Sequence, residues 1–148
     1  MSQEKVHWEN SYSIGIKSID IQHKKLFELV NKLFELEDNA NVKEEIREIL
    51  YAFSDYTVVH FKDEEAYMAS IGYPQLQEHK KIHEHIIEGL SQIIHTPASL
   101  NIIKTKMRVL AKRILIEHIV EEDHKIALYA KSNTGSEEVF DLGDVVSD

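Results

Sequence analysis

The sequence contains no cysteine, which excludes disulfide bonds, thiolate nucleophiles and thiolate metal sites from all 148 residues. Any metal ion held by this chain must therefore bind to nitrogen and oxygen atoms. No apolar run approaches the ~18 residues needed to cross a bilayer, and the opening MSQEKVHWEN has no signal-peptide core. We therefore expect a cytoplasmic protein with no membrane association.

Basic residues are also few. The chain has 17 Lys and Arg against 26 Asp and Glu, which gives a net charge of −9. Binding to nucleic-acid phosphates requires clustered basic side chains, and here they are scattered along the sequence. We expect no nucleic-acid partner. Because the polar faces are rich in charge, we also expect a monomer.

Proline and glycine are scarce, with two and five copies, and they fall where helices should stop. Between these breaks, apolar residues recur at spacings of three and four. The pattern predicts four helices, at residues 18–37, 42–71, 74–95 and 99–131. We expect Ser18, Asn41 and Ser99 to cap three of them. Short connections between such helices are typical of an all-α, antiparallel, up-down-up-down four-helix bundle.

The two ends of the chain lack this period. Residues 1–17 form an apolar and aromatic arm that we expect to pack across the bundle, through Trp8, Tyr12, Ile14 and Ile16. Residues 132–148 form an acidic tail that we expect to be flexible, and its FDLGDVV stretch is a candidate contact for a protein partner. The predicted organisation is a bundle domain over 1–131, including the arm, followed by this tail.

Nine histidines are many for a chain of this length. Five of them, together with two carboxylates, occupy positions that the helical period assigns to the core: His23, His60, His79, His83, His118, Glu64 and Asp123. These seven residues form a predicted His/carboxylate cluster. Each buried polar group without a partner costs about 1–3 kcal/mol, so the cluster requires a common partner. We expect the other four histidines to face solvent: His7, His85, His95 and His124.

Spacing within the predicted helices indicates a metal site. His79 and His83 are four residues apart, so they project from one helix face and can bind one ion. The segment HFKDEEAYM (residues 60–68) places an imidazole and a carboxylate at the same spacing. His118 and Asp123 are five apart, or roughly 140° around an ideal helix. They can still line one cavity, particularly if the helix bulges locally.

The depth of these residues along the bundle agrees with a shared site. They lie near the starts of the first and third predicted helices and near the ends of the second and fourth, so an antiparallel bundle brings all seven to one end. Five imidazoles and two carboxylates are too many for one ion, but they fit two ions bridged by the carboxylates. Iron, manganese, zinc or copper suits such ligands, and a structural zinc site is an alternative.

From Trp8 to Tyr129 the chain resembles the hemerythrin family in its single-domain bacterial form. The resemblance is carried by SIGIKSIDIQHKKLFELVNKL after Trp8, by HFKDEEAYM, by YPQLQEHKKIHEH and by HIVEED. All seven positions of the His/carboxylate cluster hold the residue type that the family uses as a ligand. A match to one of these segments alone would be weak, whereas all of them together are specific.

The resemblance implies two iron ions joined by an oxo or hydroxo bridge, with O2 bound reversibly at the iron that keeps an open position. Three histidines would hold the coordinatively full iron: His79, His83 and His118. Two would hold the open iron: His23 and His60. The two bridging carboxylates would be Glu64 and Asp123.

The resemblance also implies an O2 pocket, lined by Leu26, Phe61, Leu115 and Ile119. The same residues are explained by ordinary core packing, and both roles are compatible. The family usually has a tryptophan directly before the pocket leucine, where this chain has Ile114. A smaller side chain there would loosen the pocket wall or open a route for solvent, so the rate of autoxidation and the lifetime of the oxygenated form stay open.

The function indicated by the sequence is reversible O2 binding for storage, delivery or sensing, without catalysis. One alternative is a redox sensor that signals to a separate partner through the tail. Another is a di-iron enzyme that handles peroxide or nitric oxide. The core positions supply ligands and apolar side chains but no additional acid or base, and di-iron oxidases of the ferritin type use carboxylate-rich sites. Both observations favour O2 binding.

Overall fold

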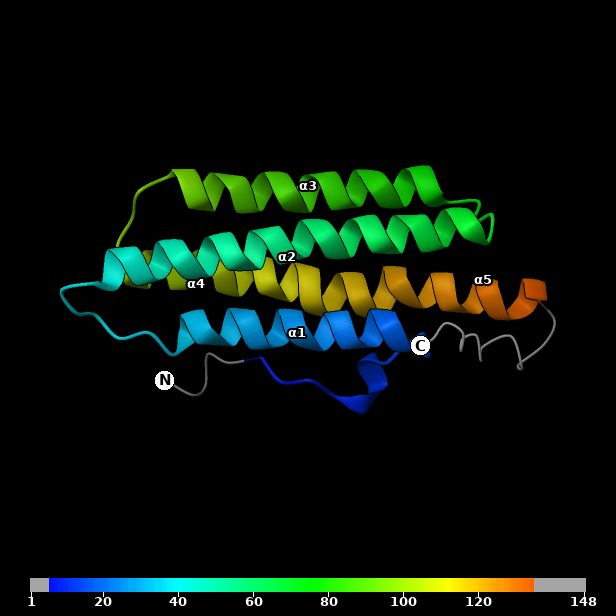
Figure 1. The fold of residues 1–148 in the computed structure, drawn as a ribbon, viewed down its shortest axis with the longest axis horizontal. Coiled ribbons are helices and arrows are strands. Elements are labelled where there is room, and N and C mark those ends of the chain that lie inside the picture. The colour runs from blue at the N-terminus through cyan, green and yellow to red at the C-terminus, as the bar shows by residue number, and fades with distance from the viewer. Residues whose placement is uncertain (1–5, 135–148) are drawn as a thin grey trace.

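The computed structural model describes residues 6–134, which form a bundle of four helical rods lying side by side (Figure 1). The first three rods are single helices: α1 (Lys17–Phe34), α2 (Val42–Ser70) and α3 (Leu76–His95). The fourth rod is continuous but has three parts: α4 (Leu100–Ala111), η3 (Lys112–Asp123) and α5 (His124–Thr134). The predicted all-α, antiparallel four-helix bundle is confirmed.

The fourth rod differs from the single α-helix expected over 99–131. Its middle segment, η3, is a π-helix of 12 residues. Hydrogen bonds in a π-helix join residues five apart, whereas those of an α-helix join residues four apart. The wider turn brings residues five apart toward the same face. It therefore places His118 and Asp123 together, which an ideal α-helix would not do.

The N-terminus of α1 is not capped as expected. The helix begins at Lys17, so Ser18 lies inside its first turn, and the prediction that Ser18 caps it is wrong. The cap position is held by Ile16, which offers no side-chain capping bond, and Asp20 in the first turn accepts a 2.9 Å hydrogen bond from the backbone N–H of Ile14 in the arm. A carboxylate in the first turn is also favoured by the helix dipole. Asp20 thus ties the arm to the helix.

The other two predicted caps have different outcomes. Ser99 caps α4 as expected, and its hydroxyl accepts a hydrogen bond from the N–H of Ile102 at 3.3 Å. Asn41 occupies the cap position of α2, but its side chain makes no capping bond. The side chain of Asn39 accepts from the N–H of Asn41 at 2.7 Å instead. The turn before α2 is therefore held by the side chain of Asn39 and not by that of Asn41.

Lys104 explains why α1 ends earlier than the predicted residue 37. This lysine is buried, and its Nζ donates to the backbone carbonyls of Phe34 at 3.1 Å and Leu36 at 2.7 Å. Backbone carbonyls at the end of a helix have no partner within it, and a cation there is favoured by the helix dipole. A side chain of α4 thus ends α1, across about 70 residues of sequence.

Replacing Lys104 by methionine is expected to lower the free energy of unfolding by about 1.5–3 kcal/mol, because bonds to a charged donor are lost and the carbonyls stay buried. Urea denaturation followed by circular dichroism measures this. The matched control is Lys106→Met on the exposed face of the same helix, where a change within about 0.5 kcal/mol is expected. Equal losses in both variants would contradict the role of Lys104.

The apolar interior is divided in two by the His/carboxylate cluster. The main core contains residues such as Leu26, Phe61 and Ile119. A smaller apolar cap closes the end of the bundle, and it consists of Ile14, Ile16, Ile19, Met68, Tyr73 and Ile126. Along three of the rods, a cluster residue falls between a main-core residue and a cap residue. The polar layer is therefore shielded from water on both sides.

The arm packs across the bundle as expected. The Trp8 ring lies edge-on to the ring of Phe27 from α1, with centroids 5.6 Å apart, and Tyr12 joins both rings. The side-chain amide of Asn31 exchanges two 2.8 Å hydrogen bonds with the backbone of Val6. Ile14 and Ile16 are buried in the apolar cap. The arm thus helps to close the bundle.

The fourth rod continues to Thr134, beyond the residue 131 at which the last helix was predicted to end. The rest of the predicted tail, with its FDLGDVV stretch, lies outside the described residues. Over residues 6–134, no helix is both long enough and apolar enough to cross a bilayer.

Candidate metal centre

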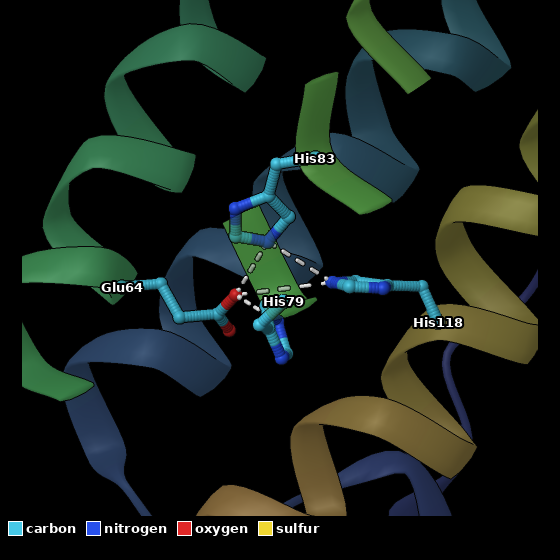
Figure 2. Close-up of side chains that lie close together, drawn as sticks. All are labelled: Glu64, His79, His83 and His118. Atoms are coloured by element: carbon cyan, nitrogen blue, oxygen red, sulfur yellow. Dashed lines mark hydrogen bonds and ion pairs between the residues drawn. The ribbon is translucent and has the colours of Figure 1, made fainter. Parts of the chain in front are cut away.

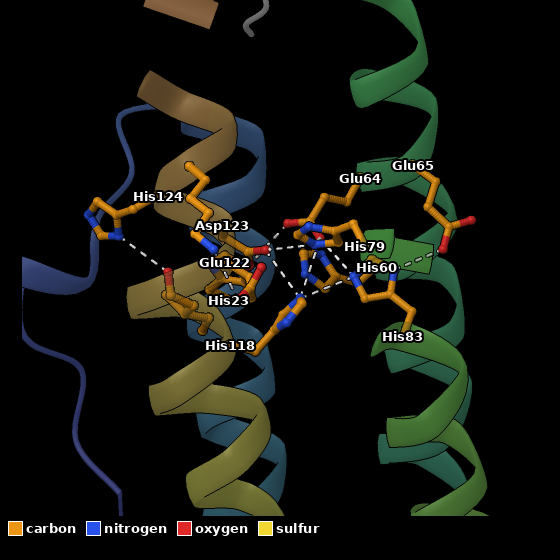
Figure 3. Close-up of polar contacts among 12 residues, drawn as sticks. His23, His60, Glu64, Glu65, His79, His83, His118, Glu122, Asp123 and His124 are labelled. Atoms are coloured by element: carbon orange, nitrogen blue, oxygen red, sulfur yellow. Dashed lines mark hydrogen bonds and ion pairs between the residues drawn. The ribbon is translucent and has the colours of Figure 1, made fainter. Parts of the chain in front are cut away.

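All seven residues of the predicted His/carboxylate cluster come together between the four rods (Figure 3), and none is more than 4 % exposed. They fall into two groups whose ligand atoms lie within 4.8 Å of one another. One group consists of Glu64, His79, His83 and His118 (Figure 2). The other consists of His23, His60, Glu64 and Asp123. The two groups share Glu64.

The two oxygens of Glu64 face different groups. Its Oε1 lies 3.0 Å from Nε2 of His83 and 3.2 Å from Nε2 of His79. Its Oε2 lies on the other side, 3.9 Å from Nε2 of His23. One carboxylate is therefore placed between two sets of imidazole nitrogens, one oxygen toward each.

Asp123 repeats this arrangement from the opposite rod. Its Oδ1 lies 3.1 Å from Nε2 of His79 and 3.2 Å from Nε2 of His118, while Oδ2 lies 3.0 Å from Nε2 of His23. Two carboxylates that each face both sets of nitrogens have the geometry of bridges between neighbouring cations. Negative charge between two cations is also what holds them close together.

Several buried polar atoms of the cluster have no hydrogen-bond partner. They include both ring nitrogens of His23, Oε2 of Glu64 and both carboxylate oxygens of Asp123. Some of these atoms lie near 3 Å from each other but not at hydrogen-bonding angles. Buried polar groups are normally paired, so converging lone pairs without donors fit a cation between them. Imidazole and carboxylate ligands fit iron, among other transition metals.

Two of the imidazoles are oriented by residues that the sequence analysis did not identify. The Nδ1 of His60 lies 2.7 Å from Oε1 of Gln22, whose amide in turn donates to Asp63 at 2.8 Å. The Nδ1 of His83 lies 2.8 Å from a carboxylate oxygen of Glu65. Such contacts fix which nitrogen carries the proton and leave Nε2 free as a ligand.

No sequence signal separated these two partners from ordinary surface residues. Gln22 directly precedes His23, and Glu65 directly follows Glu64, so each lies just off the buried face of its helix. Their partners are 38 and 18 residues away in sequence. Only the packing of the helices shows which imidazole each one contacts.

The five predicted O2-pocket residues are all buried in the main core: Leu26, Phe61, Leu115, Ile119 and Ile114. Phe61 stacks on the imidazole of His83, with ring centroids 3.7 Å apart and planes 3° from parallel. The structure thus brings an apolar wall against the cluster. The role of these residues in binding O2 stays a prediction.

Three of the histidines expected to face solvent do so: His7, His85 and His95. For His124 the prediction is wrong, because its ring is half-buried and its Nδ1 lies 3.2 Å from the carbonyl oxygen of Ile119. His124 is the first residue after the π-helix, where the wider turn shifts side chains relative to an α-helix.

Without a metal ion, the buried groups of the cluster perturb one another strongly. Burial lowers the pKa of His60 to about 4. Burial would also lower the pKa of His118, but the Asp123 carboxylate raises it to about 10. Burial opposes ionisation of Glu64, yet the neighbouring imidazoles of His118, His79 and His83 hold the pKa of its carboxyl well below the usual range. The metal-free chain thus keeps charge balanced internally.

These shifts predict a pH optimum for the stability of the chelated protein. Because the pKa of His118 rises from 6.5 to about 10 on folding, its contribution is complete below pH 6.5 and is lost as the pH rises toward 10. Because the pKa of His60 falls from 6.5 to about 4, stability also declines as the pH drops through that range. Urea denaturation should give the largest free energy of unfolding near pH 6.5. In His118→Gln this free energy should fall less steeply above pH 6.5. A flat profile in the unmodified chain would contradict this.

Comparison with known proteins agrees with this geometry. The family model of the hemerythrin HHE cation binding domain matches residues 14–130. The bacteriohemerythrin of Campylobacter jejuni is 34% identical over 122 residues, which are 82% of this chain and 92% of that protein. The bacteriohemerythrin of Pseudomonas aeruginosa is 33% identical over 119 residues, which are 78% of this chain and 75% of that protein. The bacteriohemerythrin of Clostridium acetobutylicum is 39% identical over 84 residues, which are 55% of this chain and 65% of that protein. A cation-binding family match over most of the chain and a buried His/carboxylate cluster lead to one conclusion: this chain belongs to the hemerythrin family.

Proposed function

We propose that this protein holds two iron ions in its His/carboxylate cluster and binds dioxygen reversibly, as a store, carrier or sensor. The observation that supports this best is the placement of Glu64 and Asp123. Each carboxylate directs one oxygen toward His23 and the other toward the nitrogens of His79. A site built for one ion would not need two such bridges.

The ligands divide unequally between the two positions. His79, His83 and His118 surround one position, and His23 and His60 belong to the other, with the two carboxylates between them. The position with two histidines has fewer protein ligands, so it is the one with room for an exogenous ligand. Metal ions that carry out chemistry keep such an open position, whereas structural ions are fully enclosed by protein ligands.

Iron is the proposed metal because the chain belongs to the hemerythrin family and offers only nitrogen and oxygen ligands. An iron pair supplies the two electrons that a reversibly bound O2 takes up. Gln22 and Glu65 orient two of the imidazoles, at 2.7 and 2.8 Å. Such outer contacts set ligand orientation and basicity.

The apolar wall is the chain's second contribution. Leu26, Leu115 and Ile119 are at most 1% exposed, and Phe61 covers the neighbouring imidazole of His83. A dry pocket would exclude water and protons from the metal position, which favours release of the bound gas as O2. The cluster contains no additional acid or base to assist catalysis, which supports binding over turnover.

The test uses the full chain loaded with iron. Iron per chain is measured first by atomic emission, and two ions are expected. The visible spectrum is then recorded after anaerobic reduction, after exposure to O2 and after return to vacuum. A coloured species that appears with O2 and disappears under vacuum supports reversible binding. Immediate, permanent conversion to the oxidised form would move the function to a redox sensor or an enzyme.

Replacing Ile114 by tryptophan is expected to slow spontaneous oxidation of the oxygenated form severalfold. Ile114 is 1% exposed and sits beside Leu115 in the wall of the proposed pocket. A larger ring would tighten that wall, at a cost of about 1–3 kcal/mol of stability from overpacking. The decay of the visible band over hours measures the rate, and Ile114→Leu is the volume-matched control. An unchanged rate in the tryptophan variant would count against a role of this position.

A further inference from the structure

A short row of aromatic rings leads from the His/carboxylate cluster to the surface. The ring of Tyr73 lies edge-on to the imidazole of His79, with centroids 6.5 Å apart. The ring of Tyr129 lies edge-on to Tyr73 at 5.5 Å. The hydroxyl of Tyr129 then donates a 3.1 Å hydrogen bond to the carbonyl of Gly72 in a solvent-exposed setting. Two phenols thus connect a buried ligand to the outside.

The position of Tyr73 is fixed by the turn that ends α2, at the same end of the bundle as α5 (Figure 1). Gly72 adopts φ +67, which glycine tolerates and other residues rarely do. The N–H of Gly72 donates to Ala69 at 3.2 Å, and the N–H of Tyr73 donates to Met68 at 2.9 Å. This pair of bonds is the Schellman motif. It turns the Tyr73 side chain into the apolar cap, where it is only 8% exposed.

The chemistry of the two phenols suits electron transfer coupled to proton loss. A phenol that gives up one electron also loses its proton, because the radical cation of a phenol is a very strong acid. Tyr129 lies at the half-buried outer end of the row, where a proton can pass directly to solvent.

We propose that Tyr73 and Tyr129 form a redox relay that carries oxidising equivalents from the iron-loaded cluster to the protein surface when the protein meets hydrogen peroxide. This rests on the proposed iron content. In the oxidised protein, peroxide takes up two electrons as its O–O bond breaks. The two phenols of one chain supply them: H2O2 + Tyr73–OH + Tyr129–OH gives 2 H2O + Tyr73–O• + Tyr129–O•. Each phenol gives one electron and one proton. Tyr73 passes the first oxidising equivalent to Tyr129 and keeps the second, and the Tyr129 radical couples to the Tyr129 radical of a second chain.

Phe61 and Tyr12 do not offer this route. Phe61 stacks on His83 but has no hydroxyl and is much harder to oxidise than tyrosine. Tyr12 packs against Trp8 and Phe27 in the arm, on the main-core side of the bundle. Tyr12 is therefore a suitable control, because it can be oxidised and its described ring contacts include none of the cluster imidazoles.

The experiment exposes the oxidised, iron-loaded full chain to hydrogen peroxide. Tyrosyl radical is followed by electron paramagnetic resonance, dityrosine by its fluorescence, and the modified residues by peptide mass spectrometry. The variants are Tyr73→Phe and Tyr129→Phe, which keep ring packing, with Tyr12→Phe as the matched control. Zinc-loaded protein is the second control because zinc has no redox chemistry.

The expected result is a tyrosyl signal and dityrosine at Tyr129 in the unmodified protein and in Tyr12→Phe. Tyr129→Phe should lose the dityrosine, and Tyr73→Phe should lose most of the radical signal. Tyr73→Phe should also increase sulfoxide at Met68, the buried thioether of the same cap, because oxidising equivalents then stay inside.

Two results would overturn the relay. One is a radical signal of full size in the Tyr73→Phe, Tyr129→Phe double variant. The other is oxidation mapped to Tyr12 or Trp8 with Tyr129 unmodified. Iron content and the reversible O2 spectrum are recorded on the same samples beforehand. Failure of those measurements removes the proposed function and the relay with it, whereas intact O2 binding without a Tyr129 radical removes the relay alone.

Discussion

Replacing Glu64 by alanine is expected to leave at most one tightly held iron ion per chain. Glu64 is the residue that both ligand groups share, and its two oxygens face opposite sets of imidazoles. Without it, each position loses a ligand, and the two positive charges lose a carboxylate between them. Iron per chain, measured after dialysis against a weak chelator, tests this. The reversible O2 spectrum should disappear with the second iron.

The matched control is the next residue. Glu65→Ala removes a carboxylate from the same turn of α2, but this carboxylate contacts His83 from outside, through Nδ1 at 2.8 Å. Losing such an outer contact typically weakens metal binding by about 10–100-fold without removing a ligand. Two irons at saturating iron are therefore expected. Circular dichroism shows whether each variant keeps its helices. Two tightly held irons in Glu64→Ala would rule out the bridging role of this residue.

Removing the metal is expected to lower the melting temperature by roughly 10 °C. Ions that bind only the folded chain stabilise it by about 4 kcal/mol when free metal is a thousandfold above the dissociation constant. For a chain of this size, each kcal/mol shifts the melting temperature by about 2–4 °C. The structural reason is the set of buried atoms on His23, Glu64, His118 and Asp123 that lack hydrogen-bond partners. A cation gives these lone pairs a partner.

Thermal denaturation followed by circular dichroism, with and without chelator, measures this difference. Glu64→Ala is the internal control, because a chain that cannot hold both ions should respond much less to chelation. Zinc-loaded protein should melt close to the iron form, since the contribution comes from coordination and not from redox state. Equal melting temperatures for the loaded and chelated chain would mean that the cluster satisfies itself through internal ion pairs.

The helical architecture could be read from the sequence because it depends on local spacing. The apolar stripes at intervals of three and four are the buried faces observed in all four rods, and the short breaks near Gly72 and Pro97 are the observed turns. Ser99 was predictable as a cap because its partner lies three residues away. The cap predicted at Ser18 was wrong because the helix begins at Lys17, with Ile16 at the cap position, and the bond between Asp20 and the arm at Ile14 depends on the path of the arm.

Two local features could not be fully predicted from spacing. The five-residue spacing of His118 and Asp123 allowed for a local bulge, but a π-helix over 112–123 replaces the expected α-helix, and no glycine or proline in that stretch marks its extent. It is the feature that brings His118 and Asp123 to one face. The early end of α1 depends on Lys104, whose bonds to Phe34 and Leu36 cross from another rod. Both depend on contacts between helices, which outweigh local preference.

The sequence by itself determined which residues meet. Helical period placed seven ionisable groups on buried faces, and the alternation of direction in an antiparallel bundle placed them at one end, because both properties follow from position along the chain. Tertiary structure alone decided how they face one another. The division of each carboxylate between two histidine groups, the contacts of Gln22 and Glu65, and the row from His79 through Tyr73 to Tyr129 join atoms of different rods. Such contacts depend on the packing distance and rotation of whole helices, and these are set by all the buried side chains together.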